Sequence, residues 1–121
     1  MNDLTIKTYN YEIKGNIDFA NGTATTNYIG NTVVVRRGTY NNKIYAVKYE
    51  GDVQTTEISG NKVTIHDGSF KEVYSAYAKN GQVTGNILTI EDGTFADGTG
   101  CYIYAGYVKE NGKVEGNKVV I

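Results

Sequence analysis

Three stretches of the chain repeat one another in register: GNTVVVRRGTY at residues 30–40, GNKVTIHDGSF at 60–70 and GNILTIEDGTF at 85–95. Each stretch starts with Gly-Asn, continues with a short apolar run, and reaches another Gly followed by Thr or Ser and an aromatic residue. A fourth copy, GNKVVI, starts at residue 116. Self-similarity of this kind is the sequence signature of a stacked repeat architecture.

Two more elements follow within each unit. One is apolar and aromatic, and the other is a Gly-x-Val motif at 51–53, 81–83 and 112–114. The pattern predicts units over 30–59, 60–84 and 85–115, and a truncated unit over 116–121. The apolar and aromatic element reads Ile44-Tyr45-Ala46, Val73-Tyr74-Ser75-Ala76-Tyr77 and Ile103-Tyr104-Ala105-Gly106-Tyr107.

The region before residue 30 is less regular. Residues 15–29 are predicted to form a shorter, degraded unit, in which Ile17 and Phe19 take the places of Val63 and Ile65. Residues 1–14 are predicted to form an N-terminal strand or cap region. Terminal repeats are often atypical because they close the stack.

Each element is a short β signal, too short to be stable as an isolated hairpin. Stacked units would share one core, so the sequence predicts an all-β solenoid, and the general preference of parallel crossovers favours a right-handed parallel β-helix. An antiparallel β-sandwich or meander is the alternative, because Asn-Gly and Asp-Gly also mark hairpin turns. Recurrence of residues position by position favours the solenoid. The expected columns are Asn31/Asn61/Asn86/Asn117, Val33/Val63/Leu88/Val119, Val35/Ile65/Ile90/Ile121 and Tyr40/Phe70/Phe95.

Composition limits the functional classes. The chain has 121 residues, 40% of them hydrophobic, with 12 basic and 13 acidic side chains and neither Pro nor Trp. That charge balance argues against a nucleic-acid-binding surface. No apolar run approaches 18 residues, so this segment is not expected to insert into a membrane. The single cysteine, Cys101, and the lack of metal-ligand spacing predict neither a metal site nor a cofactor.

Catalysis has one candidate constellation. Stacking would place Arg37, Asp67 and Asp92 in one column, and a β-helix enzyme that cleaves polysaccharides needs such neighbouring acids. Asp before Gly also favours a bend, so we interpret this column as a series of turns. The only histidine, His66, shares a column with Arg36 and Glu91, which is typical of a solvent-facing position. No catalytic residue is therefore predicted.

Tyrosines give the clearest hint of a binding surface. Their two columns lie three residues apart, and strand alternation would put one column inside the coil and the other outside. We favour Tyr45, Tyr74 and Tyr104 as the exposed ladder, which could stack on sugar rings or pack against a protein. The alternative is that stacked aromatic rings simply stabilise the sheet. The second column holds Lys48, Tyr77 and Tyr107.

The combination of GNxVxIxxGTF, YIYAGYV and NGxVxGN resembles repeats in the passenger regions of Gram-negative autotransporter adhesins and haemagglutinin-like surface proteins. The resemblance covers residues 15 to 121. It implies a non-catalytic rod at the surface of a Gram-negative bacterium, or secreted from it, that acts as a spacer or contact surface for a host glycan or surface protein. No signal and no membrane barrel occur in the sequence, so the resemblance also implies an excised piece of a longer protein. A carbohydrate-active β-helix enzyme and a purely structural, self-assembling fibre element are the alternatives.

The last strand predicts one more interaction. Val119-Val120-Ile121 carries no charge, Pro or bulge, and unprotected strand edges recruit other chains. We therefore expect self-association through the C-terminal edge.

Overall fold

The fold is known from a computed structural model that describes residues 3–6, 12–13, 17–22, 27–36, 39–95 and 102–121. Every regular element in these ranges is a β-strand, and the strands form two sheets. All strand pairs are parallel, so the predicted parallel β-helix is confirmed and the antiparallel sandwich or meander is wrong. The hand of the coil stays a prediction.

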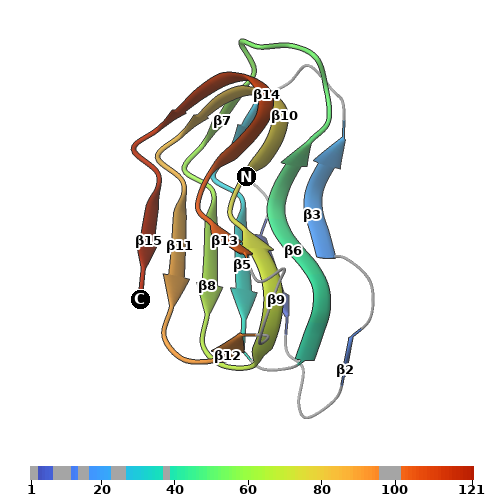
Figure 1. The fold of residues 1–121 in the computed structure, drawn as a ribbon, viewed down its shortest axis with the longest axis vertical. Coiled ribbons are helices and arrows are strands. Elements are labelled where there is room, and N and C mark those ends of the chain that lie inside the picture. The colour runs from blue at the N-terminus through green and yellow to red at the C-terminus, as the bar shows by residue number, and fades with distance from the viewer. Residues whose placement is uncertain (1–2, 7–11, 14–16, 23–26, 37–38, 96–101) are drawn as a thin grey trace.

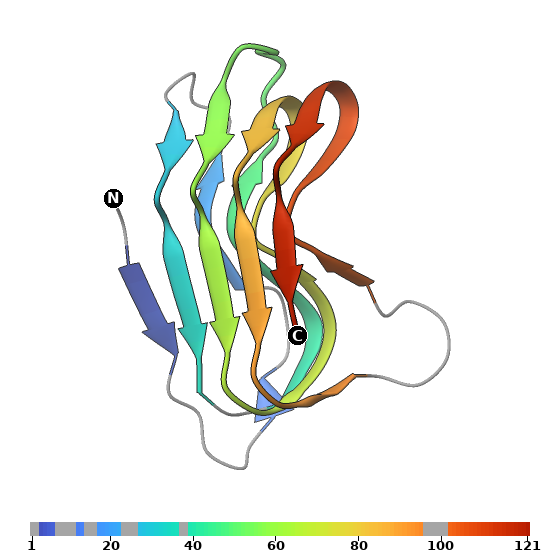
Figure 2. The ribbon, with the colours of Figure 1, turned by 90° about the vertical axis from the view of Figure 1, so that its left-hand side faces the viewer.

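Sheet one contains one strand from each successive coil (Figure 2). Its strands lie side by side in chain order, with the N-terminus and the C-terminus at opposite ends of the row. The register places Val33 beside Val63, Val63 beside Leu88 and Leu88 beside Val119, as predicted. The strands are β1 (Asp3–Ile6), β5 (Thr32–Val35), β8 (Lys62–Ile65), β11 (Ile87–Ile90) and β15 (Lys118–Val120).

Sheet two has ten strands and forms the rest of each coil (Figure 1). Its longest strand, β6, pairs with β2 and β3 on one side and with β9 and β10 on the other. The strands are β2 (Glu12–Ile13), β3 (Ile17–Gly22), β4 (Tyr28–Ile29), β6 (Thr39–Tyr49), β7 (Glu57–Ser59), β9 (Ser69–Tyr74), β10 (Tyr77–Thr84), β12 (Thr94–Phe95), β13 (Tyr102–Tyr104) and β14 (Tyr107–Glu115).

A glycine and an asparagine form the corner that leads each coil back into sheet one. Gly60 has a φ of 62°, a left-handed conformation that side chains disfavour, and Gly30, Gly85 and Gly116 have nearly the same value. The next residue is the ladder asparagine. Asn61 Oδ1 accepts hydrogen bonds from the backbone N–H and the side-chain Nδ2 of Asn31, each at 2.9 Å. The predicted asparagine column is therefore a continuous hydrogen-bonded ladder.

Two hydrophobic clusters fill the coil. The larger lies between the two sheets and includes the buried Val33, Ile65, Phe70 and Leu88, against which Phe95 packs. Phe70 is therefore buried as expected; Tyr40 pairs with it in register, but the Tyr40 side chain lies outside the described part of the structure. The smaller cluster lies within the bend formed by the later strands of sheet two. It comprises Val47, Tyr49, Ile58, Ala76, Ala78 and Val83, with Tyr28 and Val108 packed against it.

The register corrects the expected start of the repeats. Ile17 lies beside Ile44, so its expected place in the column of Val63 is wrong. Strand β1 occupies the first position of sheet one, where Leu4 lies beside Val33. The described strands from β1 to β4 thus form a first coil, and the Gly-Asn at 15–16 lies outside the described residues.

The Gly-x-Val element also differs in one unit. Val83 lies beside Ile58, so Glu57–Ser59 and not 51–53 pairs with the strand that contains the 81–83 motif. The preceding loop is held by the Tyr49 hydroxyl, which accepts hydrogen bonds from the Val53 N–H and the Thr56 hydroxyl, both at 3.2 Å. This loop accounts for part of the difference in length between the unit 30–59 and the shorter unit 60–84.

No helix in the described ranges has the length and apolar character needed to cross a membrane.

Candidate functional site: the tyrosine corner

A bend in sheet two decides where the tyrosines point. Ser75 and Ala76 are adjacent and both fully buried, which interrupts the usual alternation of faces. Ser75 Oγ donates a hydrogen bond to the Ile87 carbonyl at 2.6 Å, across the coil interior. The same interruption occurs in the preceding coil, where Ala46 and Val47 are both buried, one in each hydrophobic cluster.

Because of this bend, the two tyrosine columns lie on the same outer side of the coil. Tyr74 stacks on Tyr45 with ring centroids 4.8 Å apart and on Tyr104 at 5.3 Å. Tyr77 stacks on Tyr107 at 5.4 Å, and the Tyr77 ring meets the Tyr74 ring edge-on at 5.7 Å. Contact between columns contradicts the expectation that they face opposite sides. We call the group Tyr45, Tyr74, Tyr77, Tyr102, Tyr104 and Tyr107 the tyrosine corner.

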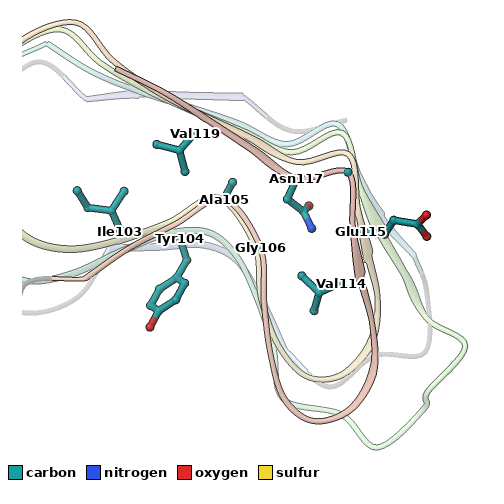
Figure 3. A pocket seen from close by; sticks show the side chains of 9 residues that line it. Ile103, Tyr104, Ala105, Gly106, Val114, Glu115, Asn117 and Val119 are labelled. Carbon is teal, nitrogen blue, oxygen red and sulfur yellow. The ribbon is translucent and has the colours of Figure 1, made fainter.

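The predicted exposed ladder is wrong for two of its three residues. Tyr45 is only 3% exposed and Tyr74 only 6%, although both point away from the hydrophobic interior. The Tyr77 ring covers them, with its centroid 5.6 Å from the Tyr45 centroid. Tyr104 is half-buried and points away from the Ile103 and Val119 side chains, as Figure 3 shows. Tyr102, 48% exposed, stacks on Tyr104 at 6.3 Å.

Acids and lysines border the tyrosine corner. The Tyr74 hydroxyl donates a hydrogen bond to Glu72 Oε1 at 2.9 Å, and Lys43 Nζ lies 3.9 Å from the same carboxylate oxygen. Lys48 Nζ is 5.2 Å from the Tyr45 ring centroid and 3.9 Å from Glu50 Oε1. The border thus pairs opposite charges beside aromatic rings.

Burial changes the acidity of two hydroxyls. Desolvation, followed by the hydrogen bond to Glu72, raises the pKa of Tyr74 far above its ordinary value. Desolvation also raises the pKa of Tyr77, with the charge of Glu50 as the next cause. Both hydroxyls therefore lose their protons less readily than the hydroxyl of an exposed tyrosine does.

The residues considered for catalysis have structural contacts. Asp67 Oδ1 accepts a hydrogen bond from the Gly68 N–H at 2.8 Å, and Asp92 does the same for Gly93 at 2.7 Å. Each carboxylate thus stabilises its own turn, as the sequence indicated. His66 Nδ1 is paired with Glu91 Oε2 at the surface. Arg37 and Cys101 lie outside the described residues, and within the described ones no three His, Cys, Asp or Glu side chains gather as metal ligands do.

Comparison with known proteins adds no relative. The chain matches no protein-family model, no curated protein and no solved structure. The fold and the tyrosine corner are therefore the observations on which a functional proposal must rest.

Sequence reasoning missed that both columns belong to one surface, and that Tyr102 adds to it. The signal was present in the spacing. Two adjacent small residues separate the tyrosines in Tyr74-Ser75-Ala76-Tyr77 and in Tyr104-Ala105-Gly106-Tyr107. Small side chains are what a sharp inward bend accommodates, and such a bend moves the second tyrosine to the same face as the first.

Proposed function

We propose that the chain is a non-catalytic β-helix module of a Gram-negative cell-surface adhesin, a spacer whose contact surface is the tyrosine corner. The resemblance of its repeats to autotransporter passenger regions supports the location and the class. Tyr102, Tyr104 and Tyr107 support the contact role, because they gather on the outer side of one coil and Tyr102 remains largely exposed. The partner proposed for this surface is a glycan.

The single observation that carries the glycan proposal is the combination of ring faces with a polar border. Pyranose rings stack their apolar faces on aromatic side chains, while their hydroxyls need hydrogen-bonding groups beside them. Glu72 provides such a group, since it lies beside Tyr102 in register and its Oε1 accepts a hydrogen bond from the Tyr74 hydroxyl at 2.9 Å. Because the lysines of the border are paired with carboxylates, it suits a neutral glycan better than a strongly charged polysaccharide.

Within the corner the tyrosines have different roles. Tyr45 and Tyr74 are covered and act as the rigid base, while Tyr77 and Tyr107 lie over them. A ligand would contact Tyr102, Tyr104 and Tyr107. Preassembled rings lose little conformational freedom on binding, which favours affinity.

A glycan array of neutral and acidic oligosaccharides tests the proposal, followed by calorimetric titration of any binder. We expect binding to neutral members that is lost in the Tyr102→Ala/Tyr107→Ala double variant. Thr64→Ala, on the outer face of sheet one, is the matched control and should bind as the natural chain does. Absence of binding across the array, or equal binding by the double variant, would reject the tyrosine corner as a glycan surface.

A further inference from the structure

The last coil leaves the interior of the stack open. A hollow of about 310 Å³ lies between the ends of β13, β14 and β15, lined by Ile103, Val114 and Val119 (Figure 3). Val119 is 41% exposed, whereas Val33, Val63 and Leu88 in the same column are fully buried. These apolar side chains have the form of a core that lacks its next layer.

The polar groups at this end also match those that a further coil would pair by hydrogen bonds. Asn86 donates hydrogen bonds from its backbone N–H and its Nδ2 to Asn117 Oδ1, at 2.9 Å and 2.8 Å. No residue in the described part of the chain accepts the corresponding bond from the Asn117 N–H. Within the described ranges, β13, β14 and β15 each pair with one neighbouring strand, so their outer edges present backbone donors and acceptors for a parallel strand.

The opposite end of the molecule offers a matching layer in the same register. One column of sheet one runs Asp3, Thr32, Lys62, Ile87 and Lys118, so that it starts with an acid and ends with a base. The neighbouring column starts with Leu4 and ends with Val119, both apolar. In sheet two, a third column runs Ile17, Ile44, Val73 and Ile103, apolar at both ends.

We infer that the open C-terminal coil takes the first coil of a second copy of this chain, stacked head to tail. Continuing the register by one coil places Asp3 of the second copy beside Lys118, at the spacing of about 4.8 Å between neighbouring strands. In the same register, Leu4 would lie beside Val119, and Ile17 beside Ile103. Among the described strands, β1 pairs with β5 alone, so its other edge is open to receive β15. Such a contact repeats without closing and builds a filament of coils.

Sedimentation velocity of the full chain over about a hundredfold range of concentration tests this inference. We expect species that grow beyond the dimer as concentration rises. Lys118→Asp alone and Asp3→Lys alone should each weaken association about fivefold to tenfold in Kd, because each brings like charges together at the junction. Lys62→Asp makes the same charge change in the same column, away from either end, and should associate as the natural chain does.

Mixing the two end variants separates head-to-tail stacking from other contacts. Each junction in an equimolar mixture again pairs an acid with a base, so association should return to within about twofold of that of the natural chain. A monomer at every concentration would overturn the inference. So would a dimer that grows no further, which would indicate tail-to-tail pairing, or a mixture that associates no better than the separate variants.

Discussion

At the scale of single residues, the asparagine ladder holds the corner of every coil. Asn61 is fully buried, yet its amide is used completely: Oδ1 accepts from Asn31, and Nδ2 donates to Asn86 Oδ1 and to the Tyr28 carbonyl. A buried polar group is tolerated only when it is hydrogen-bonded in this way. The ladder therefore fixes which coil corners may lie side by side.

Removing one amide from the middle of the ladder should be costly. Asn61→Ala removes the acceptor of both the Asn31 N–H and the Asn31 Nδ2, and each buried group left unpaired costs roughly 1–3 kcal/mol. We expect a loss of about 3 kcal/mol in the free energy of unfolding, measured by urea denaturation. Asn117→Ala, at the half-buried open end, should lose about 1 kcal/mol because water can replace the amide. Equal losses in the two variants would show that a buried amide in the middle of the ladder stabilises the fold no more than the amide at its open end.

The Tyr74 hydroxyl should make stability depend on alkaline pH. Its pKa is raised in the folded protein, by burial first and by Glu72 second, so the folded state holds this proton more tightly than the unfolded chain does. The resulting stability is fully present below about pH 10, the ordinary value for tyrosine, and decreases as the pH rises above it. Urea midpoints should therefore fall as the pH rises above about 10. In Tyr74→Phe the fall should be shallower; a fall as steep as in the natural chain would contradict this role.

At the scale of elements, the bend at Ser75 and Ala76 joins the two hydrophobic clusters and creates the tyrosine corner. Both side chains face inward where the chain turns, so there is room only for small ones. Ala76 packs in the smaller cluster, close to the point where the chain leaves the larger one.

A larger side chain at the bend should strain the core. We expect Ala76→Leu to cost about 1–3 kcal/mol, the usual penalty for adding volume to a packed interior. Thr89→Leu, on the partly exposed outward face of β11, adds a comparable side chain outside the buried interior and should change the urea midpoint little. A tolerated leucine at position 76 would mean that the bend does not depend on small residues.

These elements show where sequence reasoning succeeds and where it fails. The valine, leucine and asparagine columns were predictable because stacked coils repeat the same environment, and so the same residue type recurs. The faces of the tyrosines were not predictable from alternation, since alternation holds only within an uninterrupted strand. Alignment on the Gly-Asn at 15–16 gave the wrong register for Ile17, because Ile17–Gly22 pairs with the later part of β6.

At the scale of the whole molecule, coils of different length share one set of columns. Equivalent positions Asp3, Thr32, Lys62, Ile87 and Lys118 are 29, 30, 25 and 31 residues apart. The differences are absorbed between the paired strands, as in the loop held by Tyr49. Each coil contacts mainly its two neighbours, so stability is approximately a sum over coils and their junctions.

Removal of one entire coil should therefore leave a folded protein. Deleting residues 60–84 joins Ser59 to Gly85, which keeps the Gly-Asn corner and lets Asn86 take the ladder position of Asn61. We expect cooperative urea unfolding with a smaller m-value, because less surface is exposed on unfolding. Deleting 60–81 instead joins Ser59 to Gln82 and leaves three additional residues before the corner. If both deletions unfold alike, the coil is not the unit of this fold.

The tyrosine corner also gives the protein a natural optical probe. The chain has eleven tyrosines and no tryptophan, so tyrosine dominates its near-ultraviolet absorption and emission. The rings of Tyr45, Tyr74 and Tyr104 form one nearly parallel stack, with interplanar angles of 12° and 14°. Excitation absorbed by one ring of this stack is shared with its neighbours, and transfer to the edge-on rings of Tyr77 and Tyr107 depolarises the emitted light. Emission anisotropy of the unlabelled protein would thus report the integrity of this corner without any attached dye.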